Sequence, residues 1–578
     1  MGGITIVRLV SQRKDKGLGA VAGSLIKRLL VGSLAACGLL LAASSARAND
    51  IYFAQNASGS ANGTDCADAY GLHDTSRGIN ISSYWVPGNT LHICGSITLA
   101  ANTNAVTAQA SGASGSPITI KFEPGAVLSS PYWPGDPVHS CASNCGAIDT
   151  NNQSYITIDG GGAGIIQNTA NGSSLANQAR TMGVDLRGNF VMLKNLTIRN
   201  LYLVTSNEGN LSCPSAGNCP GVFSADVSVG NGSSVEICNN ILMDAHKGID
   251  SSSTSSAYTA PPSSMCTSAQ ANPGVNIYNN TLSDHGWQIH VGGGGYVNVY
   301  NNDASNWTPW FNPIGPNAYH LDGIIVYAGS AEITHAYIFN NYIHGDFIND
   351  SPTGFIFCTY GVSGSGSQCT IFNNLLVGTG STVAKGYGMY FHAANGNPLG
   401  PHVIYNNTLS GFGGGGIYTD GDTTQHYTVK NNIFLSGSGY YVTLNGTPNT
   451  NFASDHNVFY GGRTFGGSTG GFPGGISLAS WQASGQDAHS VEANPNLDAN
   501  WQIQNTSSAA YSRGSNLSTV NINPLNFSIP TTVGVNGGYK GTARSLTSAS
   551  WDSGAHVYGT GTSSGAPAAP QNLTATAN

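Results

Sequence analysis

Short runs of alternating apolar and polar residues recur along the chain, and most of them end in the same pair, Asn-Asn. Val275 to Asn280 and Val297 to Asn302 show the pattern clearly, with β-branched or aromatic residues at every second position. Successive markers lie 22 to 40 residues apart (302 − 280 and 280 − 240). The pattern predicts a repeated short strand that ends at a corner. The second asparagine of each pair, and the end of one imperfect copy, are Asn240, Asn280, Asn302, Asn341, Asn374, Asn407, Asn432 and Asn457.

A repeat of this length predicts one supersecondary unit per period, stacked on its neighbours. One short strand cannot bury its inward side chains alone, whereas stacked copies share a continuous core. An asparagine at the same corner of every unit can hydrogen-bond the asparagines above and below it, as in stacked Asn ladders. We therefore interpret the Asn-Asn pairs as ladder and turn residues, not as ligands. The fold class that follows is an all-β solenoid.

The chain outside the Asn-Asn units continues the pattern and resembles a known family. Residues 50–54, 88–94 and 117–122 are predicted strands, the last two with the sequences Gly-Asn-Thr-Leu-His-Ile-Cys and Pro-Ile-Thr-Ile-Lys-Phe. The segments 486–490 and 551–555 are similar to the closing segments of that family. Together they resemble bacterial exported proteins of the pectate-lyase-like superfamily. The resemblance implies a right-handed parallel β-helix with an N-terminal cap and a C-terminal covering segment.

The N-terminus predicts export. Residues 1–28 are basic, Leu29 to Ala43 are apolar or small, and Ala46-Arg47-Ala48 supplies small residues for cleavage after Ala48. The apolar run is shorter than the about 20 residues that a membrane span needs. Leu34-Ala35-Ala36-Cys37 resembles a lipoprotein signal, so lipid anchoring at Cys37 stays open as an alternative. The expected location is secreted, periplasmic or at the cell surface.

The remaining chain divides into two parts. Residues 49–560 form the predicted β-helix domain, and residues 561–578 form a Ser/Gly/Ala/Pro-rich tail. The end of this tail resembles the first strand of a fibronectin type III module. The tail is therefore either vestigial or the start of a module that the sequence cuts short.

The amino-acid composition narrows the range of functional classes that the protein can belong to. Charged residues make up 8% of the chain, against about 25% in an average soluble domain, and the net charge is −8. The 78 glycines, with many asparagines, suit tight turns rather than exposed helices. Because no basic run follows residue 28, nucleic acid is not an expected partner. Composition says nothing about the oligomeric state.

The cysteines fit an exported protein. The chain has eleven, and removal of Cys37 with the signal leaves ten. Spacing favours five local disulfides in an oxidising compartment over a metal site, because no two Cys-x-x-Cys units occur. Nearest neighbours suggest the pairs Cys66 with Cys94, Cys141 with Cys145, Cys213 with Cys219, Cys238 with Cys266, and Cys358 with Cys369.

A second strand is predicted after several markers, and its outward face gathers the scarce reactive groups. Ile249, Ile289 and Ile417 take the inward position, so their neighbours point outward. Lys247 is the only lysine in these segments, and Trp287 is their tryptophan. The enrichment indicates a binding or catalytic face. The outward neighbours that carry chemistry are Asp250, His290, His392 and Asp420.

His320 and Asp322 form a further candidate. They are two residues apart, so on a strand both face the same way, as an oriented acid/base pair or as metal ligands. In the loop before them, Trp307 and Trp310 can stack on sugar rings. The structural alternatives are an ordinary Asp-Gly turn and aromatic side chains that clamp the loop onto the solenoid.

Two chemistries fit such a face. A polysaccharide lyase needs a base, here Lys247 or a histidine, and commonly Ca²⁺, which Asp250 and Asp322 are candidates to hold. A glycoside hydrolase needs two carboxylates about 5 Å or about 6.5–9.5 Å apart, for which Asp420 is an additional candidate. The family's marked catalytic signatures, such as paired Asp-Asp with Gly-His-Gly, are absent.

The sequence therefore predicts a secreted, carbohydrate-active protein that binds, and by the first hypothesis cleaves, a polysaccharide on the outer face of its coils. Its catalytic candidates are His320, Asp322, Lys247, Asp250 and Asp420, and its substrate-binding candidates are Trp287, His290, Trp307, Trp310 and His392. The alternative is a non-catalytic adhesin or structural solenoid of the surface or matrix. The sugar and the bond stay open.

Overall fold

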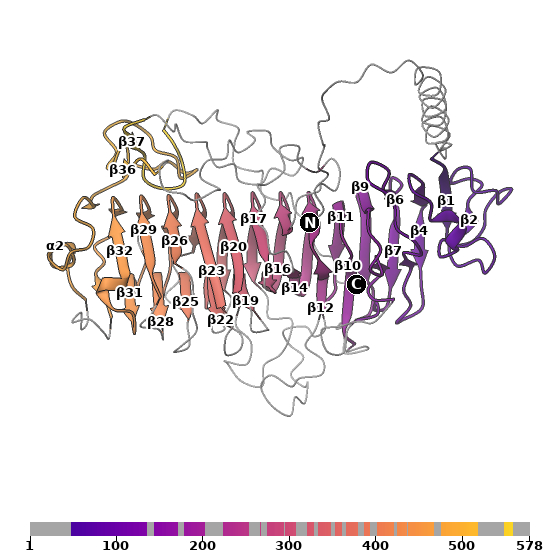
Figure 1. Ribbon diagram of the computed structural model, residues 1–578, viewed down its shortest axis with the longest axis horizontal. Coiled ribbons are helices and arrows are strands. Elements are labelled where there is room, and N and C mark those ends of the chain that lie inside the picture. Colours follow the sequence, from indigo (N-terminus) through magenta and orange to yellow (C-terminus); the bar gives the residue numbers. More distant parts are fainter. Residues whose placement is uncertain are drawn as a thin grey trace, which may run out of the picture. The chain divides into compact units, whose positions relative to one another are not determined.

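The computed structural model describes 17 parts of the chain, separated by gaps. These are residues 48–135, 144–171, 179–202, 224–253, 266, 274–293, 295–307, 321–328, 333–347, 353–360, 366–379, 386–392, 401–420, 425–435, 437–467, 475–517 and 548–558. Thirty-five of the described strands belong to one sheet, and every strand pairing printed within it is parallel. Figure 1 shows these strands following one another along the stack. The predicted right-handed parallel β-helix is confirmed.

Each coil of the helix contributes strands to three ladders. The first ladder carries the strands that end in the Asn-Asn markers. Its strands are β1 (Asp50–Ala54), β3 (Thr90–Ile93), β6 (Ile118–Phe122), β9 (Ile156–Asn168), β11 (Val191–Arg199), β13 (Ser234–Cys238), β15 (Gly274–Tyr278), β17 (Tyr296–Tyr300), β20 (Ile333–Phe339), β23 (Gly366–Phe372), β26 (His402–Tyr405), β29 (Tyr427–Lys430) and β32 (Phe452–Asp455).

The second ladder follows the marker corner, and it also takes in the later halves of β9 and β11. Its other strands are β4 (Ser96–Thr98), β7 (Val127–Ser130), β14 (Ile241–Ser253), β16 (Thr281–Gly292), β18 (Asp303–Trp307), β21 (Tyr342–Phe347), β24 (Leu375–Gly378), β27 (Thr408–Ser410), β30 (Ile433–Phe434), β33 (Val458–Phe459) and β35 (Val491–Glu492).

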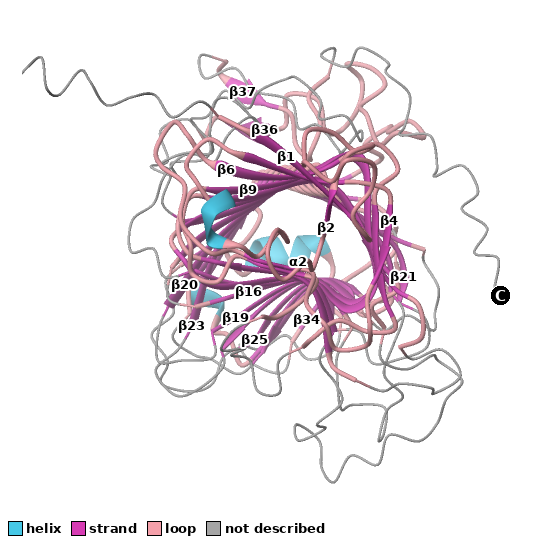
Figure 2. Cartoon of the chain, turned by 90° about the vertical axis from the view of Figure 1, so that its right-hand side faces the viewer, coloured by secondary structure: helices cyan, strands magenta, loops and turns pink. Residues whose placement is uncertain are grey.

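The third ladder closes each coil and includes the later halves of β14 and β16. Figure 2 looks along the stack and shows the strands surrounding one interior. The other strands of this ladder are β5 (Val106–Thr107), β8 (Ile148–Asp149), β10 (Thr181–Arg187), β12 (Ser224–Gly232), β19 (Asp322–Ala328), β22 (Gly354–Tyr360), β25 (Tyr387–His392), β28 (Gly415–Asp420), β31 (Tyr440–Asn445) and β34 (Phe465–Gly466).

Few other elements occur in the described chain. No helix among them is long and apolar enough to cross a membrane. The elements outside the three ladders are β2 (Tyr70–Gly71) beside β1, the 3-10 turns η1 (Ser82–Tyr84) and η3 (Asn449–Asn451), the helix α2 (Leu478–Ala483), and the antiparallel pair β36 (Gly514–Ser515) and β37 (Ser550–Trp551).

The Asn-Asn pairs act as the sequence predicted. The first asparagine of each pair adopts a left-handed backbone, with φ of 57° at Asn239 and 55° at Asn406, a conformation that asparagine tolerates well. The second is buried and accepts bonds from its neighbour: the backbone N–H and the side-chain amide of Asn341 both donate to Asn374 Oδ1, at 3.1 and 3.0 Å. The same pattern repeats from Asn240 to Asn457.

Inward side chains of all three ladders form one apolar core, with alternate strand residues fully buried. A second stack lies outside the first ladder, where aromatic rings follow one another with centroids 4.8 Å apart, as between Tyr300 and Phe339. Trp551 and Leu517 pack against this stack. Ala555 N–H also donates to Thr408 Oγ1. The predicted C-terminal covering segment is therefore present in the described residues.

Three of the expected disulfides are present: Cys66–Cys94, Cys238–Cys266 and Cys358–Cys369. Cys145 is disulfide-bonded. Its expected partner Cys141, and the predicted pair Cys213 with Cys219, lie outside the described residues. Disulfides in this number fit a protein that matures in an oxidising compartment.

Candidate functional site

The outer face of the third ladder carries the reactive groups because each strand bends inward for two consecutive residues. In β14, Ile249 is fully buried, and a Cβ at Gly248 would lie 2.9 Å from Leu282 Cδ2 in the core. Lys247 and Asp250, which flank this pair, therefore both point outward. The same arrangement places Trp287 and His290 outward on β16, where they pair in register with Lys247 and Asp250.

These four side chains form one cluster. Lys247 Nζ donates to Asp250 Oδ2 at 2.9 Å and lies 5.0 Å from the centre of the Trp287 ring. His290 Nδ1 bonds the other oxygen, Asp250 Oδ1. The Trp287 and His290 rings lie 5.6 Å apart between centroids. Parallel register between neighbouring coils thus brings together groups from strands 40 residues apart in sequence.

The cluster orients one imidazole for proton transfer. Burial works against ionisation of Asp250, but Lys247 and His290 outweigh it and hold the pKa of this carboxyl far below its usual range. The ionised Asp250 accepts the Nδ1–H of His290. His290 Nε2 has no hydrogen-bond partner among the described residues. Nε2 is also buried from solvent. A carboxylate that holds one ring nitrogen and leaves the other without a bond is the arrangement of an oriented general base.

Asp322 lies on β19 in the next coil, where it is in register with Trp287 of β16. It is fully buried, and its Oδ1 accepts the Gly354 N–H at 3.3 Å. Its Oδ2 has no partner in the described chain. Burial raises the pKa of Asp322 to about 8, so the carboxyl is protonated at neutral pH. Because the carboxyl is fully buried, only a group that reaches this position inside the coil can accept its proton.

Asp322→Asn should therefore become progressively more stable than the parent protein as the pH rises from 5 to 7. The folded carboxyl keeps its proton to about pH 8, whereas an unfolded aspartate loses it near pH 4. The unfolded parent binds fewer protons in this window, so its free energy of unfolding falls with pH, and the amide has no such penalty. The expected gain is about 2.7 kcal/mol over these two pH units. Urea unfolding at both pH values measures it; a pH-independent difference would contradict the raised pKa.

A strip of aromatic rings continues along the same face. Phe357 stacks on Tyr390 with centroids 5.0 Å apart, and Tyr387 stacks on Tyr418 at 4.5 Å. Tyr327 is 37% exposed and stands 6.1 Å from the His290 ring, which joins the strip to the cluster. We call these five residues the aromatic strip. The sequence pattern did not indicate these five residues, although the tyrosines at 387, 390 and 418 share outward strand positions.

A second His–Asp pair lies at the far end of the strip. His392 Nδ1 is 3.3 Å from Asp420 Oδ2, which also accepts the Tyr390 hydroxyl at 3.0 Å, while Asn445 donates to the other oxygen at 3.1 Å. Asp420 on β28 stands five coils from Asp250 on β14, which is about 24 Å at a strand spacing of about 4.8 Å. These two carboxylates cannot serve one glycosidic bond.

One prediction from sequence is wrong, and two lie outside the described residues. Trp307 is no surface platform: it is fully buried, its ring stacks on Phe355 at 4.8 Å, and its Nε1 donates to the Asp322 carbonyl. The indole points into the core because Trp307 takes an inward position at the end of β18. His320 and Trp310 lie outside the described residues.

The expected Ca²⁺ ligands do not form a suitable site. Ca²⁺ takes six to eight oxygen ligands. Both oxygens of Asp250 are already bound, by Lys247 and by His290. Asp322 is fully buried and offers a single oxygen without a partner in the described chain. These two residues therefore do not fit a hard divalent cation.

A buried polar network inside the coils was not indicated by the sequence pattern. Asp226 Oδ2 lies 2.8 Å from His285 Nε2, and Gln288 Oε1 lies 2.7 Å from His285 Nδ1. Burial raises the pKa of Asp226 well above its usual value and lowers that of His285 to about 4. Both groups are thus neutral, with Asp226 as donor to Nε2. None is exposed, so the network stabilises the interior and does not reach substrate.

A cavity of about 580 Å³ lies away from the cluster, among the first coils, where His73, Asp74 and Asn104 are among its lining residues. Another group, Cys145 with Asp149 and Asp185, is compact enough to suggest a metal. Cys145 is disulfide-bonded, however, and Arg187 pairs with both carboxylates. Neither feature adds to the candidate site.

Comparison with known proteins finds solved structures that resemble this chain in fold only. No protein-family model matches the chain, and no curated protein matches it. A solved GH136 lacto-N-biosidase from Eubacterium ramulus is 15% identical, with 74% of this chain and 67% of that chain covered and a TM-score of 0.42. Pectate lyase Pel9A is 13% identical, covering 88% and 96%, with a TM-score of 0.35. The PL6 family alginate lyase AlyGC is 12% identical, covering 72% and 52%, also at 0.35. At these values the likenesses say nothing about activity.

Proposed function

We propose that the protein binds a polysaccharide along the outer face of the third ladder and cleaves it at the Asp250–His290 pair. One observation carries the proposal: Asp250 holds one ring nitrogen of His290 and leaves the other without a partner among the described residues, beside the Trp287 ring. This pair can move a proton and lies on the outward side of its strands, where the His290 and Asp250 side chains are 13% and 14% exposed.

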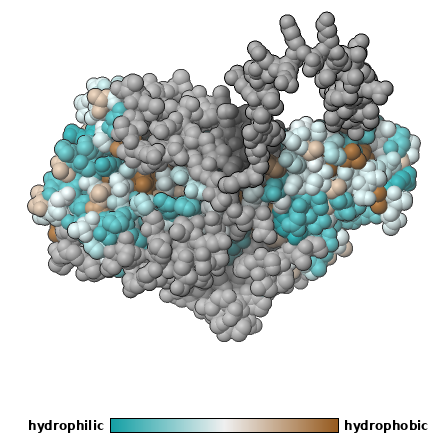
Figure 3. Space-filling view, in the orientation of Figure 1, coloured by the Kyte–Doolittle hydropathy of each residue, from teal (hydrophilic) through white to brown (hydrophobic). Residues whose placement is uncertain are grey.

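The aromatic strip favours an extended carbohydrate as the substrate. Tyr327, Phe357, Tyr387, Tyr390 and Tyr418 come from four successive coils, so their rings recur along the stack as sugar rings recur along a polysaccharide. Tyrosine and tryptophan supply large contact area at low cost in side-chain entropy, and their polar atoms suit hydroxyl-rich ligands. In the space-filling view most of the described surface is hydrophilic or neutral, and apolar residues form only separate patches (Figure 3).

The reaction that the cluster supports best is elimination at a uronate. His290 Nε2 removes the proton on the carbon next to the sugar carboxylate. The electrons of that C–H bond form a ring double bond, and the bond to the neighbouring glycosidic oxygen breaks. The leaving oxygen takes a proton from the imidazolium or from water. Asp250 keeps the imidazole in place and stabilises its charged form, while Lys247 keeps Asp250 ionised.

A second candidate reaction is hydrolysis, and Asp322 favours it. Its pKa of about 8 makes it a proton donor at neutral pH, whereas Asp250 stays ionised. Two carboxyl groups whose surroundings push their pKa values apart are the signature of an acid and a base. They lie two coils and three strand positions apart, about 14 Å between backbones. This exceeds the separation of the two carboxyl groups in inverting glycosidases, so hydrolysis stays the second candidate.

We further propose that this reaction takes place outside the cytoplasm. The basic and apolar N-terminal segment fits an export signal, and three disulfides are present in the described chain.

The test is an assay of the purified mature chain, from Asn49, on a panel of acidic and neutral polysaccharides. Absorbance of unsaturated uronates reports elimination, and reducing ends without unsaturation report hydrolysis. Unsaturated product is the expected result. Reducing ends alone would move the assignment to the Asp322 reaction. If no polysaccharide of the panel is cleaved but one glycan is still bound, an adhesin role would replace catalysis.

Chelation of divalent ions should leave the cleavage rate unchanged within about two-fold. Asp250 is neutralised by Lys247 and Asp322 is protonated, so neither requires a hard cation. The measurement compares initial rates with EDTA and with added Ca²⁺. A rate that collapses with EDTA and returns with Ca²⁺ alone would contradict this arrangement and restore the original expectation of a Ca²⁺ site.

A further inference from the structure

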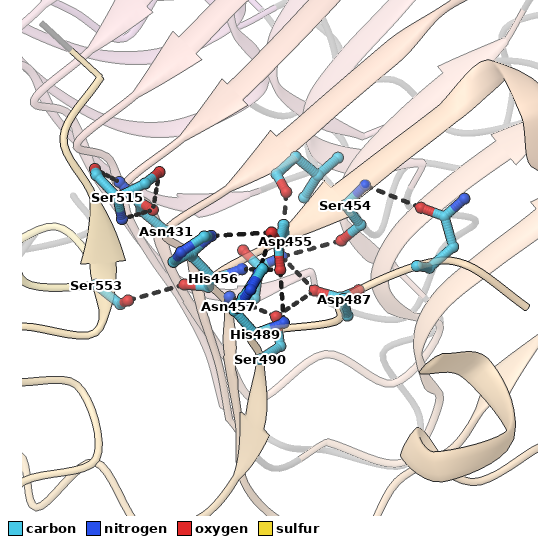
Figure 4. Close-up of polar contacts among 12 residues, drawn as sticks. Asn431, Ser454, Asp455, His456, Asn457, Asp487, His489, Ser490, Ser515 and Ser553 are labelled. Atoms are coloured by element: carbon cyan, nitrogen blue, oxygen red, sulfur yellow. Dashed lines mark hydrogen bonds and ion pairs between the residues drawn. The ribbon is translucent and has the colours of Figure 1, made fainter. Parts of the chain in front are cut away.

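Three metal-binding side chains meet where the last coil contacts the closing segment. Asp455 Oδ2 lies 3.1 Å from His456 Nδ1 and 2.8 Å from His489 Nδ1, and all three ligand atoms fall within 4.8 Å of one another. Figure 4 shows both imidazoles directed at the same carboxylate from two different segments. The His489 side chain is 69% exposed, so the group opens to solvent.

His456 occupies a position that the preceding coils, from Asn239 to Asn431, give to asparagine. Its φ is 59°, against 55° at Asn406 and 60° at Asn431 in the two preceding coils. A left-handed backbone suits asparagine better than most other residues. Histidine at this corner places an imidazole beside Asp455, the last residue of β32, where the preceding coils have an amide. The departure from the repeat therefore supplies a ligand.

The closing segment holds the second histidine in place. Asp487 is buried and accepts bonds from Trp481 Nε1 at 2.7 Å and from Asn457 Nδ2 at 2.8 Å. The backbone N–H of His489 donates to Asp455 Oδ1 at 2.8 Å, and so does that of His456 at 2.9 Å. One carboxylate oxygen is thus used by the backbone, and the other faces the two rings.

We propose that Asp455, His456 and His489 bind a divalent transition-metal ion of the zinc type, with solvent completing its coordination. Tetrahedral Zn²⁺ has bonds of about 2.0–2.1 Å, which set neighbouring ligand atoms about 3.3 Å apart. The two Oδ2-to-Nδ1 distances of 3.1 and 2.8 Å come within a few tenths of an ångström of that value. Two imidazoles and one oxygen suit zinc, nickel or copper rather than Ca²⁺ or Mg²⁺.

The bound ion ties the closing segment to the last coil. His489 belongs to the segment after α2, whereas Asp455 and His456 belong to the end of the first ladder. A ligand that binds only the folded arrangement stabilises it in proportion to its occupancy. The site lies away from the Asp250–His290 cluster and does not depend on the proposed reaction.

The test is calorimetric titration of the purified, untagged full chain with ZnCl₂ after removal of chelator. One equivalent should bind, and His456→Asn should weaken binding by about 100-fold or more. This variant restores the Asn-Asn pair of the other coils, so it removes a ligand without disturbing the corner. His489→Gln should have the same effect. The matched control is His344→Gln, which breaks a lone His–Asp pair on β21 and should keep full affinity.

A second readout is the thermal midpoint. Excess Zn²⁺ should raise it in the parent protein and in His344→Gln, but not in His456→Asn. Binding of equal strength in all four proteins would place the ion on other histidines and overturn the proposal. Absence of saturable binding by the parent would overturn it as well.

Discussion

Asn374→Leu should lower the free energy of unfolding by about 4 kcal/mol. Asn374 Oδ1 accepts from the backbone and side chain of Asn341, and its Nδ2 donates to Ile338 O at 2.9 Å and to Asn407 Oδ1 at 3.0 Å. Leucine has a similar volume but cannot make these bonds. Each buried polar group left without a partner costs about 1–3 kcal/mol, and partial relaxation reduces the sum. Urea unfolding followed by circular dichroism measures the loss.

The matched control is Asn500→Leu, the same replacement at an exposed asparagine outside the ladder. Its effect should stay within about 0.5 kcal/mol, as is usual for surface positions. A comparable loss at both positions would mean that the leucine itself, and not the broken ladder, is responsible. A loss below about 1 kcal/mol at Asn374 would show that the ladder contributes little to stability.

His290→Gln should lower the turnover number for the cleaved polysaccharide by about 10²–10⁴-fold, the usual contribution of a positioned general base. Glutamine keeps a polar group beside Asp250 but cannot accept the substrate proton. Because the aromatic strip is unchanged, the affinity for the polysaccharide should fall by less than about five-fold. Initial rates over a range of substrate concentrations separate the two effects, and circular dichroism checks the fold.

Three further variants separate catalysis from structure. His344→Gln removes another His–Asp pair, on the second ladder, and should leave turnover unchanged. Asp250→Asn should also reduce turnover, because the imidazole loses its orienting carboxylate. Trp287→Ala should act mainly on affinity. If His290→Gln keeps full turnover while Trp287→Ala loses binding, the face binds glycan and the base lies elsewhere.

Much of the architecture follows from local pattern. Alternation within the strands specifies which side chains face inward, and Ile249, Ile289 and Ile417 are buried as expected. The Asn-Asn pair marks the corner because asparagine combines a left-handed backbone with a side chain that bonds the next coil. Nearest-neighbour spacing also indicated three disulfides that the structure contains. All of these features depend on residues that are close together in the sequence, or on such a feature repeated along the chain.

The site residues are harder to predict because they meet across coils. Asp250 and His290 were expected on one face, and the register makes them direct partners. Asp420 was expected along the same outer face, and the structure places it there, five coils from Asp250 and paired with His392. Trp307 belongs to the core, because its strand presents it inward. The number of residues at each corner decides which strand positions align between neighbouring coils. Loops of different length make that number hard to read from the sequence.

The sequence by itself determined the coil, its corner and the inward face, since each depends on residue preferences within one repeat. Only the tertiary structure decided which coils adjoin and in what register. That register turned His290 into the partner of Asp250, buried Asp322 and raised its pKa, and brought His489 to Asp455 from 34 residues away. Contacts of this kind depend on stacking distance and loop length together, and neither is visible in the order of residues.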